Sequence, residues 1–163
     1  MAEVKFEDYS QEAINMLDSE VNAWLHEAAG IIESEAVRNT KVGKVAGGNT
    51  KQKWKYIVDA FAKKATIGNT EQTAIWLELG TGDHALNGDG RKGGWYIPIG
   101  DGPNQISQEV VDAYHFKTVT GKDGVRFAFT TGMKPRRILH NAAEKSKKRI
   151  QNLFKAKLKK LGE

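Results

Sequence analysis

The sequence predicts an α+β protein with a long N-terminal helix, an antiparallel sheet with a short inserted helix, and a long basic C-terminal helix. Apolar residues recur at steps of three and four near both ends of the chain, which is the spacing of one helix face. Between these ends, runs of β-branched and aromatic residues alternate with glycine-rich segments, as strands alternate with turns. The length of 163 residues predicts a single domain, residues 1–163.

The N-terminal helix is expected over residues 10–38, with Ser10 as its N-cap. Its acidic residues fall mostly on the face opposite the apolar one. A glycine- and lysine-rich segment, residues 39–53, follows and predicts a mobile loop. The apolar face consists of Ile14, Leu17, Val21, Trp24, Leu25, Ala28, Ile32 and Ala36.

The middle of the chain begins with a predicted strand over residues 54–61, which are rich in aromatic and β-branched side chains. Residues 65–68 are interpreted as a second short strand or a turn. Asn69 and Gln72 have the spacing of a capping box, which predicts that a short helix begins there. Gly80 is expected to end this helix, because glycine readily adopts the left-handed conformation found after a last turn.

A second glycine-rich segment, residues 82–94, predicts another mobile loop. It leads into a strand over residues 95–99, which is expected at an edge because Pro98 has no amide hydrogen to donate. Residues 110–119 and 125–131 are the clearest predicted hairpin, with a short glycine-containing link between them.

The final helix is expected to begin at Pro135, since proline is favoured at the first helical position. The chain is strongly asymmetric in charge: residues 1–40 hold nine acids and two bases, and residues 134–160 hold eleven bases and one acid. Three interpretations of the basic helix are open: a nucleic-acid surface, a solvated helix face, or a partner for the acidic helix of the same or a neighbouring subunit. The apolar stripe of the helix is Ile138, Leu139, Ala142, Ile150, Leu153, Phe154, Leu158 and Leu161.

Composition excludes several classes of site. The absence of cysteine excludes disulfides, thiolate catalysis and sulfur-ligated zinc. The acidic N-terminus lacks the basic and apolar regions of a signal peptide, and no apolar run approaches the roughly 18 residues of a membrane span. We therefore expect a soluble intracellular protein without membrane partners.

The glycine-rich loop carries weak matches to two ligand motifs. Residues 88–93 match the spacing of a dinucleotide loop, but they lie between a coil and a strand rather than between a strand and a helix. Asp83, Asn87 and Asp89 resemble part of a calcium loop, yet Gly94 stands where a bidentate glutamate is needed. Neither match predicts a ligand, so no metal and no cofactor are expected.

Catalytic patterns are equally weak. Glu78 and Asp83 are the only carboxylate pair that suggests acid–base chemistry, so a hydrolase using them is the least favoured alternative. We expect a protein without enzymatic activity. The histidines are scattered without metal-ligand spacing, at His26, His84, His115 and His140.

The order of these features, with two short motifs, resembles the minor tail, neck and tail-completion proteins of long-tailed bacteriophages, which form the head–tail connector and upper tail. The first motif is Glu78-Leu-Gly-Thr-Gly at the end of the short helix. The second is Lys134-Pro-Arg-Arg-Ile-Leu-His-Asn-Ala, where Ile138 replaces an aromatic residue that is common in the family. The resemblance covers residues 10–160, apart from residues 98–112, which match no pattern of the family.

The resemblance implies a structural virion protein that is assembled in the host cytoplasm and forms a ring, expected to contain six subunits. The ring would contact adjacent connector, portal-side or tail-tube proteins and leave a channel through which DNA passes without sequence-specific binding. A small basic nucleic-acid-binding protein that uses the C-terminal helix is the alternative. In the ring, Thr81 is expected to bond the carbonyls at the helix end, and the loop to leave as an arm whose return is anchored by Trp95 and Tyr96. Lys147 and Lys148 are candidate charge contacts, and the expected subunit interface comprises Glu78, Gly80, Thr81, Gly82, Arg91, Trp95, Tyr96, Pro135, Arg136 and Arg137.

Overall fold

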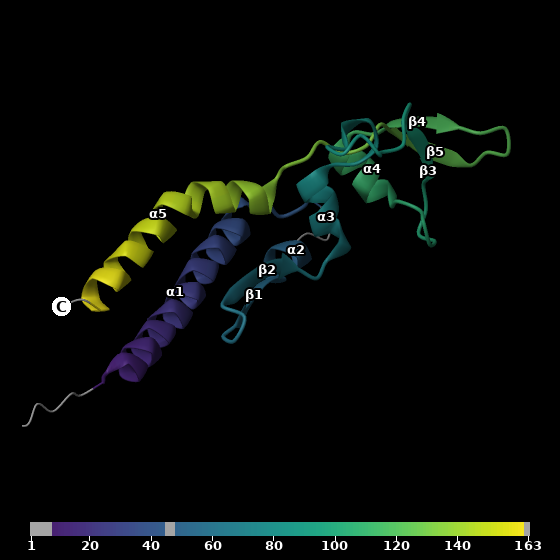
Figure 1. Ribbon diagram of the computed structural model, residues 1–163. Coiled ribbons are helices and arrows are strands. Elements are labelled where there is room, and N and C mark those ends of the chain that lie inside the picture. Colours follow the sequence, from purple (N-terminus) through teal and green to yellow (C-terminus); the bar gives the residue numbers. More distant parts are fainter. Residues whose placement is uncertain (1–7, 45–47, 162–163) are drawn as a thin grey trace, which may run out of the picture.

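The computed structural model describes residues 8–44 and 48–161 and confirms an α+β fold. Figure 1 shows an elongated molecule with two helices and a hairpin at one end and a second sheet at the other. The elements are α1 (Ser10–Asn39), α2 (Asn49–Gln52), β1 (Trp54–Asp59), β2 (Lys64–Asn69), α3 (Gln72–Leu79), a 3₁₀ turn (Gly82–His84), β3 (Trp95–Pro98), α4 (Gln108–Tyr114), β4 (Lys117–Thr120), β5 (Arg126–Thr130) and α5 (Ile138–Leu161).

Helices α1 and α5 pack side by side, as their apolar stripes predict (Figure 1). Trp24 of α1 stacks on Phe154 of α5 with ring centroids 4.8 Å apart, and its indole nitrogen donates to the Ile150 carbonyl at 3.2 Å. The prediction that Ser10 caps α1 is wrong. Tyr9 occupies the N-cap position, and the amide of Ser10 donates to the Asp8 carboxylate, which holds the chain just before the helix.

The β1–β2 hairpin packs against another side of α1. Burial alternates along β1 and sets its inward face: Trp54 is buried and Tyr56 and Val58 are half-buried, whereas Lys55, Ile57 and Asp59 are exposed. The Tyr56 ring meets His26 of α1 edge-on at 5.9 Å, and the indole of Trp54 donates to the Thr40 hydroxyl at 2.8 Å. The core lies where this hairpin, α1 and α5 meet, and its buried members are Ala36, Trp54, Ile138 and Ala142.

The start of α3 corrects the predicted capping box. Asn69 is the last residue of β2, where its side chain accepts from the Glu71 amide and donates to the Thr50 carbonyl. Because Asn69 is used in this way, Glu71 becomes the N-cap and makes no side-chain cap bond. Gly80 ends the helix with a φ of 76°, as expected for a glycine after the last turn.

The strands form two antiparallel sheets, β1–β2 and β3–β5–β4, rather than the one sheet expected. Strand β3 lies at an edge of the second sheet, as Pro98 predicts, and the β4–β5 hairpin is confirmed. The strand predicted over residues 110–119 is wrong over residues 110–114, which belong to α4. The Ser107 hydroxyl accepts from the Val110 amide and begins this helix, and His115 ends it in a left-handed conformation.

The prediction that α5 begins at Pro135 is also wrong, since the helix begins at Ile138. The amide of Arg136 donates to the Leu77 carbonyl at 2.7 Å, and Arg137 has a φ of 50°. Residues 136 and 137 therefore lie outside the helix, and the backbone of Arg136 contacts the end of α3. Pro135 lies in the extended link before the helix.

The two loops differ in how much of them is described. Within residues 39–53, residues 49–52 form α2, Lys44 bonds Tyr114 and the Ala113 carbonyl, and residues 45–47 lie outside the described part of the chain. Residues 82–94 fold back on themselves, because the Gly93 amide donates to the Asp83 carboxylate at 3.0 Å. The mobility expected for both loops and the single-domain assignment remain predictions.

The molecule exposes far more surface than a compact protein of its size. Its accessible surface is 11,799 Å², whereas a compact monomer of 18.0 kDa exposes roughly 8,000 Å². Among the described residues, no helix is long and apolar enough to cross a bilayer. Large apolar side chains that are at least half exposed include Ile14, Met16, Val42, Ile57, Phe61, Ile75, Leu86 and Tyr96.

Candidate functional site

The two motifs that carry the family resemblance contact each other within one chain. Glu78, in the last turn of α3, accepts from the amides of Leu139 and His140 at 2.8 and 3.0 Å. The first amides of a helix lack partners within the helix, and the helix dipole favours negative charge there. Glu78 therefore caps α5 from a distance in sequence, although it was expected to face a neighbouring subunit.

Replacing Glu78 tests this cap. We expect Glu78→Ala to lower the free energy of unfolding by about 1–2 kcal/mol, the usual effect of losing an N-terminal cap. Glu78→Gln should cost less, because an amide oxygen still accepts one of the two bonds. The measurement is urea unfolding, with the exposed Glu144→Ala of α5 as control; equal stability of the two alanine variants would contradict the cap.

The Gly80-Thr81-Gly82 segment runs beside the link that precedes α5. The amide of Thr81 donates to the Met133 carbonyl, and its hydroxyl accepts from the Met133 amide, both at 2.9 Å. The amide of Asp83 donates to the Thr131 carbonyl at 2.9 Å. The Thr81 hydroxyl thus bonds Met133, in the link before α5 of the same chain. The expectation that it bonds the carbonyls of α3 is wrong.

Both glycines of this segment are fixed by backbone contacts. A Cβ on Gly80 would lie 2.8 Å from Pro135 Cδ and 2.9 Å from the Met133 carbonyl oxygen. A Cβ on Gly82 would lie 2.3 Å from the Thr131 carbonyl oxygen and 2.8 Å from the Trp95 ring. Their role is close packing of two segments of one chain, which we call the α3–α5 junction (residues 77–83 and 131–140).

Of the two aromatic residues after the loop, Trp95 is half-buried against the junction and Tyr96 is exposed. Trp95 packs on Gly82, and the guanidinium of Arg91 lies over its ring at 5.8 Å. Tyr96 packs on Phe129 at 5.2 Å and keeps 56% of its surface exposed. Arg91 and Tyr96 therefore remain available to a partner, whereas Trp95 packs at the end of the loop against Gly82. That Trp95 and Tyr96 together anchor an arm in a ring remains a prediction.

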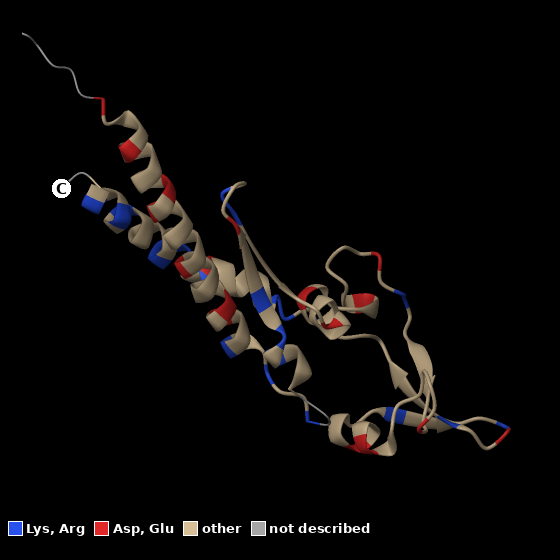
Figure 2. Ribbon diagram, turned by 90° about the horizontal axis from the view of Figure 1, so that it is seen from below, with Lys and Arg blue, Asp and Glu red and all other residues tan. Residues whose placement is uncertain are grey.

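The side chains of the predicted basic residues make none of the junction contacts described above. Arg136 contributes to the junction only through its backbone amide. Arg136 and Arg137 have exposed side chains beside the start of α5. Lys147 and Lys148 are exposed on α5. These four side chains remain candidate contacts, and Figure 2 shows bases spread along α5 and acids along α1.

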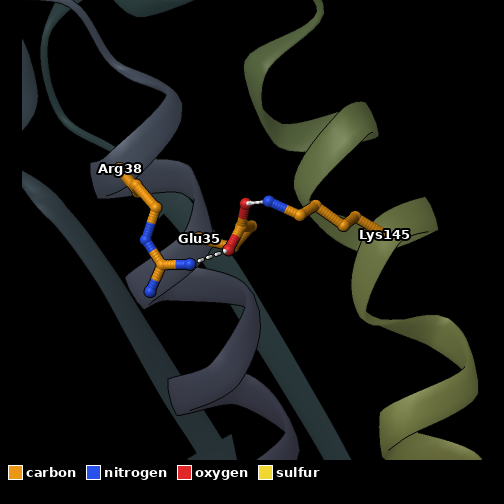
Figure 3. A network of polar contacts seen from close by, with 3 residues as sticks. All are labelled: Glu35, Arg38 and Lys145. Atoms are coloured by element: carbon orange, nitrogen blue, oxygen red, sulfur yellow. Dashed lines mark hydrogen bonds and ion pairs between the residues drawn. The ribbon is translucent and has the colours of Figure 1, made fainter.

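The acidic and basic helices are partners in the same chain, which is one of the alternatives left open by the sequence. Glu35 of α1 is buried and pairs with Lys145 of α5 and, at 2.8 Å, with Arg38 (Figure 3). Lys157 of α5 pairs with Glu27 at 2.8 Å. Part of the charge asymmetry is thereby neutralised inside the chain. Sequence reasoning had no signal that singled out these pairs.

These pairs shift two ionisation equilibria. The hydrogen bond from Lys145, with Arg38 nearby, holds the pKa of Glu35 below its ordinary value, although burial acts in the opposite direction. The hydrogen bond to Glu27 and the charge of Glu20 raise the pKa of Lys157, and desolvation opposes them. Glu35 therefore favours folding in its charged form, and so does Lys157.

The Glu35 shift predicts acid sensitivity. A depressed pKa contributes stability above the unfolded-state value of about 4.3, and this contribution is lost as the pH falls through the folded-state pKa. We expect the free energy of unfolding of Glu35→Gln to fall less than that of the wild type as the pH falls below about 4.3. Urea unfolding across this range measures it; parallel pH curves for the two proteins would contradict the prediction.

The candidate ligand and catalytic residues have structural roles. The Glu78 carboxylate is held at α5, and the Asp83 carboxylate is held by Gly93. In the described part of the chain, no three histidine, aspartate or glutamate side chains gather as a metal site. Comparison with known proteins finds no matching family, no matching curated sequence and no matching solved structure.

Proposed function

We propose that this protein is a structural subunit of a bacteriophage virion, which assembles into a ring of six in the head–tail connector or at the top of the tail. The ring joins the capsid to the tail, contacts adjacent connector, portal-side or tail-tube proteins, and leaves a channel for DNA. This role requires no catalysis and no cofactor.

The observation that carries the proposal is the large accessible surface of the molecule, on which many large apolar side chains are exposed. An accessible surface of 11,799 Å², against roughly 8,000 Å² for a compact monomer, leaves ample area for contacts with neighbours. A stable interface buries about 800 Å² on each partner, and a ring subunit contributes to two of them. Exposed apolar residues lie on α1, the β1–β2 hairpin and α3, so several sides of the molecule are suited to burial.

The elongated shape also supports a ring subunit. Both helices and the first hairpin lie at one end, and the three-stranded sheet with α4 lies at the other (Figure 1). The α3–α5 junction lies between these ends and is bonded within the chain. Interfaces would then form on the outer surfaces, including Arg91, Tyr96 and the start of α5.

The alternative function, nucleic-acid binding by α5, is favoured by one observation. Lys145 and Lys157 pair with acids of α1, but Lys147 and Lys148 stay exposed and are free to meet phosphates. Such binding would weaken steeply with rising salt and would not require oligomers.

Size-exclusion chromatography with light scattering, at low and high salt, tests both functions. A closed oligomer with the mass of six subunits supports the ring. A monomer that fails to join purified capsids or tails, and that shifts short DNA of arbitrary sequence only at low salt, supports the alternative. If the protein binds DNA through α5, the double variant Lys147→Glu, Lys148→Glu should abolish the DNA shift. If these lysines instead join neighbouring subunits, the same variant should change the amount of oligomer and its dependence on salt.

A further inference from the structure

The turn of the β1–β2 hairpin presents the most exposed large apolar side chain described in the protein. Phe61 is 98% exposed. The turn that carries it is ordered, because the Asp59 carboxylate accepts from the amides of Phe61 and Ala62 at 3.0 and 2.9 Å. Lys63 adopts a φ of 51° there and pairs with Asp18 of α1 at 3.2 Å. Phe61 is thus a fixed apolar knob with nothing covering it.

An apolar pocket lies at the opposite end of the same hairpin. It has a volume of about 360 Å³ and opens between the end of β2, the start of α3 and the start of α5. An apolar cavity of about 150 Å³ already accepts a benzene ring, so this pocket has room for a phenylalanine side chain. We call it the base pocket; its lining includes Trp54, Glu71, Ala74, Ile75, Glu78 and Leu139.

The knob and the base pocket of one chain cannot meet. Strand β1 runs for six residues from Trp54 to the turn, which corresponds to about 20 Å at the rise of a β-strand. The turn lies at the end of the hairpin away from α3 (Figure 1). The hairpin is held against α1 along its length, by Tyr56 with His26 and by Lys63 with Asp18. Phe61 can therefore enter such a pocket only on another copy of the chain.

We propose that Phe61 of one copy inserts into the base pocket of the next copy. The charges around the two sites have opposite signs: Lys63 and Lys64 flank the knob, and Glu71 and Glu78 are the only charged residues among the described ones that line the pocket. Lys63 also pairs with Asp18 and Glu71 with Lys53, so Lys64 is the lysine left to approach the pocket rim. Each copy carries one knob and one pocket in different places, so the contact is heterologous and repeats from copy to copy. This contact rests on the proposed function and deepens it, since it names the surfaces that join neighbouring subunits.

The cysteine-free sequence allows a direct test by crosslinking. Ala62→Cys, which places a thiol beside the knob and leaves Phe61 in place, and Gln72→Cys, which places one on the rim of the base pocket, are purified separately, mixed, and treated with a short thiol-reactive crosslinker. We expect dimers that contain one chain of each kind, at a yield at least about tenfold above the pair Ala62→Cys with Val119→Cys. Val119 is a suitable control because it is exposed on β4, at the other end of the molecule.

A second pair of variants tests the energetic role of the knob. Phe61→Ser should raise the dissociation constant of the oligomer at least about tenfold, and Val119→Ser should leave it unchanged. Phe61 makes no core contact, so circular dichroism of the variant should match the wild type. Crosslinking of Ala62→Cys with Gln72→Cys at the control yield overturns the proposed contact, and so does preferential pairing of Ala62→Cys with itself.

The outcomes separate the contact from the proposed function. A ring of unchanged mass and unchanged dissociation constant in Phe61→Ser overturns the contact and leaves the ring function standing. Mixed dimers that grow into open chains instead of a closed ring support the contact and count against a ring.

Discussion

Gly82→Ala is expected to be among the most destabilising single substitutions in this protein, with a loss of about 3–5 kcal/mol in the free energy of unfolding. Gly82 has a φ of 61°, which costs a residue with a side chain about 1–2 kcal/mol. In addition, the new Cβ would lie 2.3 Å from the Thr131 carbonyl oxygen, so the two segments of the α3–α5 junction would have to separate.

Gly88→Ala is the matched control for this prediction. Gly88 has a similar φ of 72°, but a Cβ added there meets nothing within 4 Å. It should therefore show the conformational cost of about 1–2 kcal/mol without the steric one. Urea unfolding of both variants separates the conformational and the steric contributions. Equal losses of unfolding free energy would contradict the prediction, because the junction would then accommodate the added methyl group at little cost.

Trp54→Ala is expected to cost about 3–5 kcal/mol, as truncations of buried aromatic residues do. Trp54 is 4% exposed and lies in the core with Ala36, Ile138 and Ala142. Its indole also donates to the Thr40 hydroxyl at 2.8 Å, a bond that alanine cannot make. With a typical stability of 5–15 kcal/mol, this loss would bring the protein close to unfolding.

Trp76→Ala is the control, because Trp76 lies on α3 with 42% of its surface exposed. We expect it to cost at most about 1 kcal/mol, as substitutions near the surface usually do. Thermal or urea unfolding followed by circular dichroism compares the two variants. Similar losses of unfolding free energy in the two variants would contradict the prediction, because burial of Trp54 would then stabilise the protein no more than the half-exposed Trp76 does.

Local sequence patterns predicted the elements whose ends are set by nearby residues. The apolar stripe of residues 14–36 predicted α1, Gly80 predicted the end of α3, and Pro98 predicted an edge strand. Residues 108–114 were missed because two adjacent valines suggest a strand, although Ser107 before them is a typical N-cap and was a usable signal.

Features set by distant residues could not be predicted. Pro135 has the right residue type to begin α5, but the cap comes from Glu78 and the Arg136 amide is bonded to α3. Likewise, the two short motifs were expected to face a neighbour, and their contact with each other depends on how the chain folds back. Phe61 was the last residue of a predicted strand, and nothing in its local sequence reveals that it would be uncovered.

The pairing of the first and last helices has a consequence for how the protein folds during synthesis. Glu35 meets Lys145 across 110 residues, and Glu20 meets Lys157 across 137. At translation rates of about 5–20 residues per second, the roughly 100 residues between α1 and α5 take about 5–20 s to emerge. During that time the face of α1 that later packs on α5 has no native partner. Folding can be completed only after α5 leaves the ribosome, and such non-local contacts make this last step slow compared with the formation of the β1–β2 hairpin.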